Sequence, residues 1–225
     1  MGMFLNSIEP YDKYKTITKG LYFVDKTELL EELIPALEQE QRFFCITRPR
    51  RFGKTVMANM IASFFEKSEG GSDIFDRLKI SEYPKYKEHL NKYDVVYIDF
   101  SEMPKECDSY KKYISRIEEG IYYDLREKYS DLYLKQEDAI WDIFSKIFNE
   151  TKKKFIFVMD EWDAVFHMSF MTEKNREDYL LFLKLLLKGQ SYVELAYMTG
   201  VLPIAKYSDG SELNMFLEYN MATRI

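Results

Sequence analysis

Two groups of residues, far apart in the sequence, carry side chains suited to phosphate chemistry. The first is Gly53-Lys54-Thr55, which ends the stretch TRPRRFGKT (47–55) and matches the last part of the phosphate-loop pattern G-x-x-x-x-G-K-[ST]. The second is Asp160-Glu161, which follows the apolar run FIFVM. A lysine with a hydroxyl and a pair of carboxylates are the groups that bind a nucleoside triphosphate and its Mg²⁺.

These residues have complementary expected roles. Gly53 lets the backbone approach an anion closely, and the amides after it begin a helix whose dipole favours negative charge. Lys54 neutralises the terminal phosphates, and the Thr55 hydroxyl binds Mg²⁺. Asp160 holds the same ion opposite Thr55, and Glu161 polarises the attacking water. We therefore expect the nucleotide to bind to Arg51, Phe52, Gly53, Lys54, Thr55 and Val56.

One position departs from the pattern, because Arg48 stands where the first glycine should be. Gly-Lys-Thr also occurs by chance, and two acids after a strand can be solvated loop residues. Arginine adopts a left-handed backbone only with difficulty, so we expect a loop more open than a glycine-led one, stiffened by Pro49. We expect the Arg48, Arg50 and Arg51 side chains to face outward, toward the γ-phosphate side, a neighbouring subunit or nucleic acid.

A further polar residue, Thr199, stands beside Gly200 at the end of the apolar stretch ELAYMTGV (194–201). Its side chain either contacts the γ-phosphate or the attacking water, or serves only as a turn or cap residue, and both alternatives stay open. The residues 99–101, Asp-Phe-Ser, end another strand, and we expect them to be structural.

The elements that position these residues alternate along the chain. Apolar runs predict strands at 43–47, 94–101, 154–163 and 194–201, and helical periodicity predicts helices at 27–39, 54–67, 110–129, 137–150 and 176–189. This alternation predicts an α/β, three-layer P-loop NTPase fold, with a mostly parallel sheet flanked by helices. In such sheets ligands bind at the carboxyl ends of the strands.

Two helix boundaries have specific signals. Asp25 is a plausible N-cap of the helix Thr27 to Gln39, and Glu28, three residues later, would complete a capping box. The helix that begins after the loop is expected to end in SEGGSD (68–73).

Composition narrows the function classes. A chain of 225 residues with 46% hydrophobic residues can build a large core, and its net charge of −6 argues against coating nucleic acid by bulk electrostatics. Cys45 and Cys107 give no disulfide framework, and His89 and His167 have no partners at zinc-ligand spacing. There is no leader-like start or membrane-spanning run, so we expect a cytoplasmic protein without membrane association.

Four segments in order carry a family resemblance: YFVDKTELL, RPRRFGKT, FVMDEWD and MTGVLPIAKYSDGSELNMF, which together span residues 22 to 216. On these motifs the chain resembles the predicted bacterial AAA-ATPase-like family of P-loop proteins. The resemblance implies that Lys54 and Thr55 are Walker A residues, Asp160 and Glu161 the Walker B pair, and Thr199 a sensor-like residue. It also makes Arg48 a family trait, since an arginine and a proline before RRFGK are typical of this family.

The resemblance further implies a domain plan. Residues 1–41 form an N-terminal segment and helix packed on the core, and residues 42–225 form the P-loop ATPase core. Family members typically continue into a lid and a C-terminal nuclease-like domain of the restriction-endonuclease type, and we expect this chain to stop before both. The segment LYFVDKT (21–27) is expected to border the adenine, with packing of Phe23 and Val24 into the core as the alternative.

The function expected from these observations is Mg²⁺-dependent ATP binding and hydrolysis, with ATP and Mg²⁺ as cofactors and a homo-oligomer as a further expected assembly. A second hypothesis is a nucleotide-gated switch or scaffold with little turnover. A third is a nucleic-acid-binding protein that uses the basic loop, because five basic residues and no acidic one lie between Arg42 and Thr55. No acceptor site specifies a nucleoside kinase.

Overall fold

The computed structural model describes residues 2–37, 39–67, 74–207 and 212–221. Within them, five parallel strands form one sheet in the order β2-β3-β4-β1-β5. The strands are β1 (Phe43–Thr47), β2 (Asp94–Asp99), β3 (Phe155–Asp160), β4 (Val193–Gly200) and β5 (Leu217–Tyr219). The expected α/β class with a parallel sheet is confirmed.

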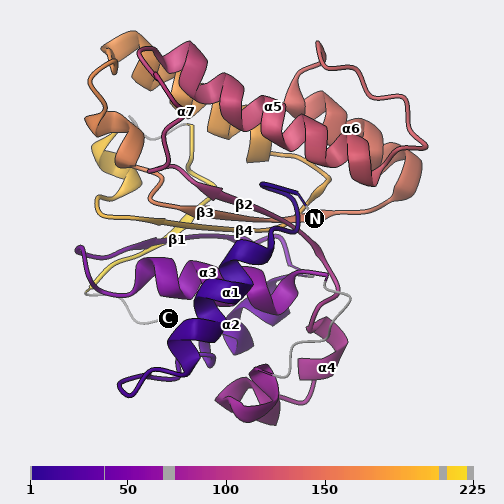
Figure 1. Cartoon of the computed structure of the whole chain (residues 1–225), viewed down its shortest axis with the longest axis vertical. Coiled ribbons are helices and arrows are strands. Elements are labelled where there is room, and N and C mark those ends of the chain that lie inside the picture. Colours follow the sequence, from indigo (N-terminus) through magenta and orange to yellow (C-terminus); the bar gives the residue numbers. More distant parts are fainter. Residues whose placement is uncertain (1, 38, 68–73, 208–211, 222–225) are drawn as a thin grey trace.

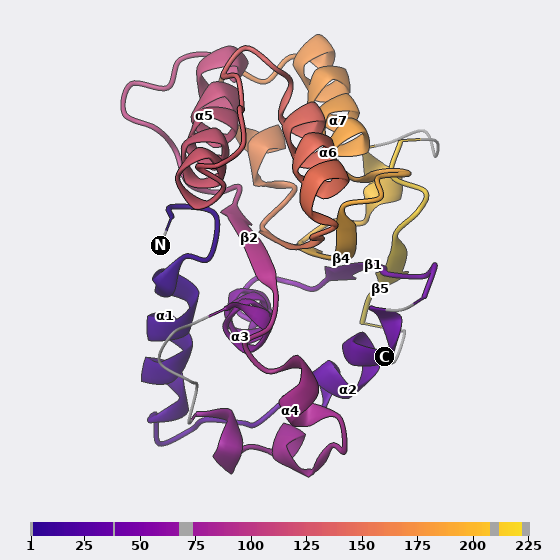
Figure 2. The same ribbon diagram turned by 90° about the vertical axis from the view of Figure 1, so that its right-hand side faces the viewer.

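Helices cover both faces of the sheet, which makes three layers (Figure 1). One outer layer holds α5 (Tyr110–Lys128), α6 (Ile140–Thr151) and α7 (Glu173–Leu187), and the other holds α1 (Ile8–Thr18), α2 (Leu29–Ala36), α3 (Lys54–Phe65) and α4 (Tyr86–His89). Figure 2 shows the same two layers from the side, on either side of the strands. No described helix is long and apolar enough to cross a membrane.

The alternation of side chains along each strand supplies two separate cores. On β3, Ile156 and Val158 join the core beneath α3, whereas Phe157 and Met159 join the core beneath α5 to α7. The same alternation puts Asp160, two residues after Val158, on the α3 face. The last residue of this strand therefore faces the layer that contains α3, the helix that follows the predicted phosphate loop.

Strand order decides which strand ends meet. Because β4 lies between β1 and β3, its last residues stand between the loop that follows β1 and the carboxylates that follow β3. In the registers, Ile46 is opposite Thr199 and Thr47 is opposite Gly200. The order thus brings three sequence-distant segments to one edge of the sheet.

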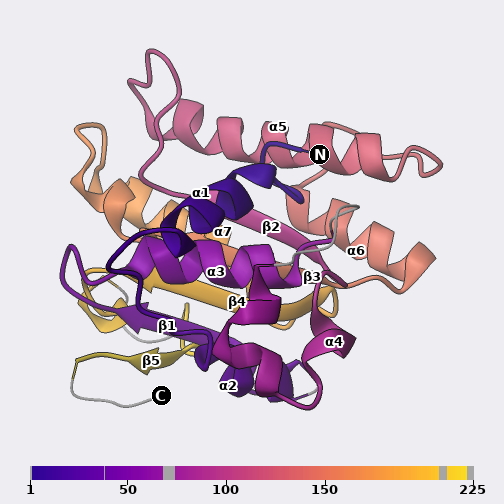
Figure 3. The same cartoon turned by 60° about the horizontal axis from the view of Figure 1, so that its bottom comes forward.

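Helix α3 is buried on nearly all sides. It follows the loop after β1 and packs against the sheet on one side, while α1 lies along its other side (Figure 3). All residues from Ala58 to Phe65 are buried. The second half of α3 is therefore part of the core, whereas its first turn, from Thr55 to Met57, is partly exposed.

The prediction for α2 is wrong at its start. The helix begins at Leu29 with Glu28 at the N-cap position, and no side chain caps it. The Asp25 carboxylate instead accepts hydrogen bonds from the Thr27 amide at 2.9 Å and the Thr27 hydroxyl at 2.7 Å. A short Asx turn has replaced the capping box, because the backbone amide two residues on is the nearer donor.

Other elements differ from the sequence-based assignment in their bounds. The helix α1 and the three-residue strand β5 were not predicted, and β2, β3 and β4 end at Asp99, Asp160 and Gly200, one to three residues before the predicted ends. Helix α3 ends at Phe65, with its C-cap at Glu66. The expected terminator SEGGSD lies outside the described residues.

Candidate nucleotide-binding site

The loop between β1 and α3 runs from Arg48 to Gly53. Gly53 is the N-cap residue of α3, with a left-handed φ of 79°, and no side chain caps the helix start. No acidic residue lies in the first turn. The amides that open α3 are therefore left to bind another acceptor, and the helix dipole favours an anion there.

Arg48 does not need the backbone freedom that a glycine would give. Its amide donates to the Gly200 carbonyl at 3.1 Å, so it prolongs the pairing of β1 with β4, and one guanidinium nitrogen donates to the Thr47 carbonyl at 3.0 Å. The left-handed residues of this loop are Arg51, with a φ of 70°, and Gly53. The strained backbone conformation is therefore found at Arg51, near the end of the loop, and not at position 48, where the pattern has a glycine.

The three loop arginines have no carboxylate partner within the described part of the chain. Arg50 and Arg51 are exposed, whereas Arg48 is half-buried and lines a cavity beside the loop. Arg48 thus departs from the expected outward orientation, because its side chain folds back onto its own strand.

Lys54 and Glu161 form an ion pair across the sheet edge. The Lys54 ammonium lies 3.3 Å from a Glu161 carboxylate oxygen, and the lysine side chain is only 3% exposed while that of Glu161 is 26% exposed. Burial raises the pKa of Glu161, and the charge of Lys54 opposes that shift. Glu161 also has a left-handed φ of 50°, an uncommon conformation for a non-glycine residue.

Asp160 is fully buried and only half satisfied. Its Oδ1 accepts hydrogen bonds from the Thr199 hydroxyl and from the Glu161 amide, the latter at 3.1 Å. Its Oδ2 has no hydrogen-bond partner among the described residues. Burial raises the pKa of Asp160, whereas the hydroxyls of Thr199 and Thr55 favour its ionised form. The solvated-loop alternative does not hold for Asp160, because its exposure is 0%.

The unpaired oxygen beside a threonine hydroxyl makes a donor set that suits a small hard cation. Mg²⁺ prefers oxygen ligands, keeps several waters and is usually bound by one or two protein groups with substrate phosphates. The described residues contain no group of three or more His, Cys, Asp or Glu side chains that could hold a metal by themselves. Asp160 and Thr55 therefore suit an ion whose other ligands are phosphate and water.

The Thr199 hydroxyl is committed to neighbouring groups on β3. It donates to Asp160 and accepts the Glu161 amide at 3.4 Å. Residues 99–101 make a turn of their own, in which the Asp99 carboxylate accepts the amide and the hydroxyl of Ser101 at 2.9 and 2.6 Å. Thr199, by contrast, joins two strands at the site.

Trp162, Asp163 and Gly200, for which the sequence suggested no role, fix the two strand ends together. The buried Asp163 carboxylate accepts the amides of Val201 at 3.1 Å and Leu202 at 2.9 Å. A Cβ on Gly200 would lie 2.4 Å from the Trp162 indole, so only glycine permits this packing. The motif FVMDEWD contains two of these residues, but their partners, at and just after the end of β4, become visible only with the strand order.

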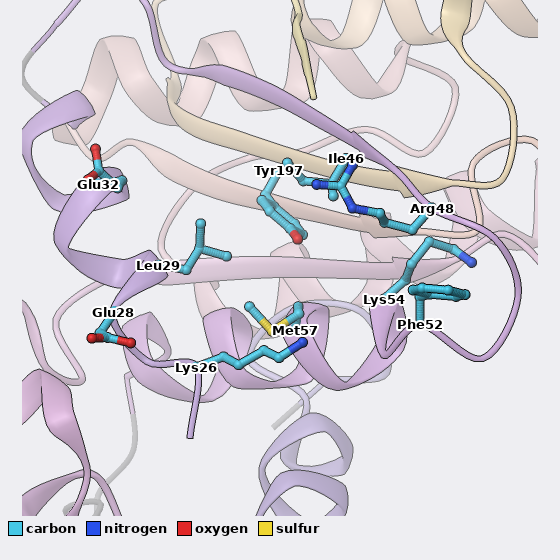
Figure 4. Close-up of a pocket in the computed structure, with 10 residues that line it drawn as sticks. All are labelled: Lys26, Glu28, Leu29, Glu32, Ile46, Arg48, Phe52, Lys54, Met57 and Tyr197. Atoms are coloured by element: carbon cyan, nitrogen blue, oxygen red, sulfur yellow. The ribbon is translucent and has the colours of Figure 1, made fainter. Parts of the chain in front are cut away.

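Two cavities flank the loop. One, of about 350 Å³, lies between α2 and the loop, and its lining includes Arg48, Lys54 and Tyr197 (Figure 4). The other, of about 440 Å³, is bordered by Tyr22 to Val24 and by Gly53 and Val56. Neither is lined by Asp160, Glu161 or Thr199. Lys54, which lines the first cavity and pairs with Glu161, connects that cavity to the carboxylates.

Comparison with known proteins gives one family match. A family model described as predicted AAA-ATPase matches residues 8–208. A search of curated proteins found no match.

Proposed function

The chain belongs to the AAA-ATPase-like family of predicted AAA-ATPases, and on that premise we propose that it binds ATP with Mg²⁺ and hydrolyses it. The observation that carries the proposal is the meeting of Lys54, Asp160 and Glu161 beside the uncapped start of α3. In this proposal residues 42–225 are the ATPase core, on which residues 1–41 pack.

The phosphates would be held by the segment from Arg51 to Val56. The free amides at the start of α3 donate to the β-phosphate, and Gly53 permits its close approach. Lys54 lies at the same helix start and supplies a positive charge for the β- and γ-phosphates. Its near-complete burial supports this role, since a buried ammonium attracts an anion more strongly than one surrounded by water.

Mg²⁺ would be held by the Thr55 hydroxyl and, directly or through its water shell, by Asp160. The unpaired buried Oδ2 of Asp160 supports this assignment, because leaving such an atom unsatisfied is costly. When bound, the ion neutralises charge on the β- and γ-phosphates. Thr199 would keep the Asp160 carboxylate oriented, through the hydrogen bond that it donates to Oδ1.

Glu161 would orient and deprotonate the attacking water. In the nucleotide-free protein it pairs with Lys54, so the arriving phosphates compete with Glu161 for the ammonium and release the carboxylate. The raised pKa of Glu161 suits a proton acceptor, because the efficiency of a general base increases as its pKa approaches the working pH.

The base of the nucleotide would lie in the 440 Å³ cavity. Its lining is mainly apolar or aromatic and includes Phe23, Val56 and Met60, and it adjoins Gly53. Tyr22 and Val24 are 90% and 68% exposed. A bound purine would cover such surface, which is otherwise unfavourable in contact with water.

Two measurements test the proposal. At about 100 times its dissociation constant, ATP with Mg²⁺ should raise the melting temperature by roughly 5 to 10 °C, and Lys54→Ala should remove most of that shift. Turnover by Glu161→Gln should fall at least about 100-fold while ATP binding persists. Equal stabilisation of the wild type and Lys54→Ala would refute the binding site.

The same assays separate hydrolysis from a switch with little turnover. The Lys54–Glu161 ion pair favours a switch, because it keeps the proposed base occupied until nucleotide arrives. Tight ATP binding with no measurable hydrolysis, or with hydrolysis unchanged in Glu161→Gln, would support a nucleotide-gated switch and contradict an ATPase that uses Glu161 as its base.

A second candidate function, binding of a nucleic-acid backbone, rests on the exposed Arg50 and Arg51, which have no carboxylate partner in the part of the chain that the structure describes. Such binding should weaken steeply as salt rises, because it releases condensed counterions. Binding to DNA that is absent, or insensitive to salt, rejects this candidate.

A further inference from the structure

We propose that Lys26 binds the α-phosphate of the nucleotide, and that the surrounding segment 22–28 is folded to present it. This inference rests on the proposed ATP site and adds a phosphate ligand that comes from outside the loop. Its support comes from the anchoring of the residues on either side of Lys26, from the position of Lys26 between the two cavities, and from the lack of a partner for its charge among the described residues.

The residues on either side of Lys26 are fastened to a distant part of the chain. Besides its turn to Thr27, the Asp25 carboxylate accepts the Lys79 amide at 2.7 Å, and the Thr27 hydroxyl accepts the Ile80 amide at 3.1 Å. Thr27 is completely buried. These hydrogen bonds fix the backbone before and after Lys26, whereas the Lys26 side chain itself is exposed.

Lys26 stands where the two cavities beside the loop meet. It lines both of them, together with Phe52 and Met57. In Figure 4 its ammonium is directed toward the Met57 and Lys54 side of the cavity, away from Glu28. A lysine at this junction can reach a ligand that passes from the loop into either cavity.

The direction of the nucleotide follows from the placement of Glu161. A γ-phosphate must lie near Glu161 to be hydrolysed, and neither cavity is lined by Glu161 or by Asp160. Lys54 contacts Glu161 at 3.3 Å and also lines the 350 Å³ cavity, so a nucleotide with its γ-phosphate at Glu161 can extend past Lys54 into a cavity beside the loop. The α-phosphate is the anionic group closest to the nucleoside, so it comes nearest to Lys26.

The ammonium of Lys26 is available for this contact. Among the described residues it forms no ion pair, and the neighbouring Glu28 pairs instead with Lys79 at 2.8 Å. Lys54 is already held by Glu161. A second, exposed cation would add attraction for the α-phosphate without the desolvation cost that a buried lysine carries.

Calorimetric titration with ATP, ADP, AMP and adenosine tests this assignment. Lys26→Ala should weaken the binding of all three phosphorylated nucleotides by a similar factor, about tenfold, because AMP carries the α-phosphate alone, and should leave adenosine binding unchanged. Lys26→Arg should recover most of the loss. Lys19→Ala, which removes an exposed lysine that lines neither cavity, is the matched control and should bind like the wild type.

Each other outcome contradicts the assignment in a recognisable way. If Lys26→Ala binds ATP like the wild type while Lys54→Ala does not, Lys26 is not a ligand, and the proposed function stands. An equal loss for adenosine would mean that Lys26 supports the nucleoside or the fold and not a phosphate. If the wild type binds neither ATP nor ADP, the proposed function and this inference both fail.

Discussion

Two buried aspartates at opposite ends of the sheet show how differently one fold treats the same side chain. Asp94 begins β2, and Asp160 ends the neighbouring β3. Asp94 receives the Lys128 ammonium, the Tyr129 hydroxyl at 2.8 Å and the Asn6 amide at 3.1 Å. From the described residues, Asp160 receives donors on Oδ1 alone. The fully satisfied carboxylate joins elements together, and the half-satisfied one is left with an oxygen for a ligand.

Their pKa values separate accordingly. Burial by itself raises the pKa of both, but at Asp94 the hydrogen bonds from Lys128, Asn6 and Tyr129 outweigh burial and lower it. At Asp160 burial prevails over the threonine hydroxyls. The amino end of the sheet is thus built for stability, while the carboxyl end keeps an unsatisfied charge, and that is the end at which α/β sheets bind ligands.

The largest expected effect comes from removing the charge of Asp160. Asp160→Asn should lower ATP turnover by roughly 1,000-fold, because the Mg²⁺ that neutralises the phosphates would lose a ligand. It should also abolish the extra stabilisation that Mg²⁺ adds to bound ATP, measured as melting temperature with and without EDTA. Glu161→Gln should keep that Mg²⁺ effect. A Mg²⁺ effect that persists in Asp160→Asn would place the metal elsewhere.

Asp94 should matter for folding and not for turnover. Asp94→Ala leaves the ammonium of Lys128 and the hydroxyl of Tyr129 without their partner, so the free energy of unfolding should fall by about 3 kcal/mol in urea titrations. In Asp160→Asn the free energy of unfolding should fall by less than this, since the side-chain amide oxygen can still accept the hydrogen bonds made to Oδ1. Equal losses in the two variants would remove the contrast between the two sites.

The pH dependence of stability should run in opposite directions at the two sites. A lowered folded-state pKa means that Asp94 contributes stability above its unfolded pKa of about 3.9, which is lost as pH falls through the folded value. A raised folded-state pKa means that any stability contributed by Asp160 is present below about pH 3.9 and is lost as the pH rises through the folded-state pKa. Urea titrations from pH 3 to 8 should therefore show that the free energy of unfolding of Asp94→Asn falls less than that of the wild type as the solution becomes acidic. For Asp160→Asn, the free energy of unfolding should increase relative to that of the wild type as the pH rises above 4.

The smallest effect is expected from Thr199. Thr199→Val keeps the shape but removes the donor to Asp160 and the acceptor for the Glu161 amide, so stability should fall by about 1 to 2 kcal/mol. Thr16→Val, which removes an exposed hydroxyl bonded to the Asp12 carbonyl on α1, should cost less. If the two variants lose the same amount, the buried threonine has no special part in holding Asp160.

The strands and the main helices could be predicted because their signals are local. The run FFCIT is apolar throughout and flanked by polar residues, and it forms β1 with the predicted bounds. The start of α2 could not be predicted, because Asp25 is held by the distant amide of Lys79. Strand β5 has only three residues and exists through its pairing with β1.

The meeting of Lys54, Asp160 and Glu161 at one edge of the sheet was predictable, but the geometry of the candidate site was not. Spacing and strand endings were enough to bring Lys54, Asp160 and Glu161 to one edge of a parallel sheet. The ion pair of Lys54 with Glu161 and the hydrogen bond of Thr199 to Asp160 depend on β4 lying between β1 and β3. That order is set by the packing of both helical layers, which no local pattern in the sequence records.

The close packing of Trp162 on Gly200 gives the protein an internal optical probe. Trp162 follows Glu161 directly, is completely buried, and is one of two tryptophans, the other being Trp141 on α6. In Trp141→Phe, fluorescence emission comes from this single indole. A shift in its wavelength or intensity when ATP is added would report, in real time, whether filling the site disturbs the ends of β3 and β4.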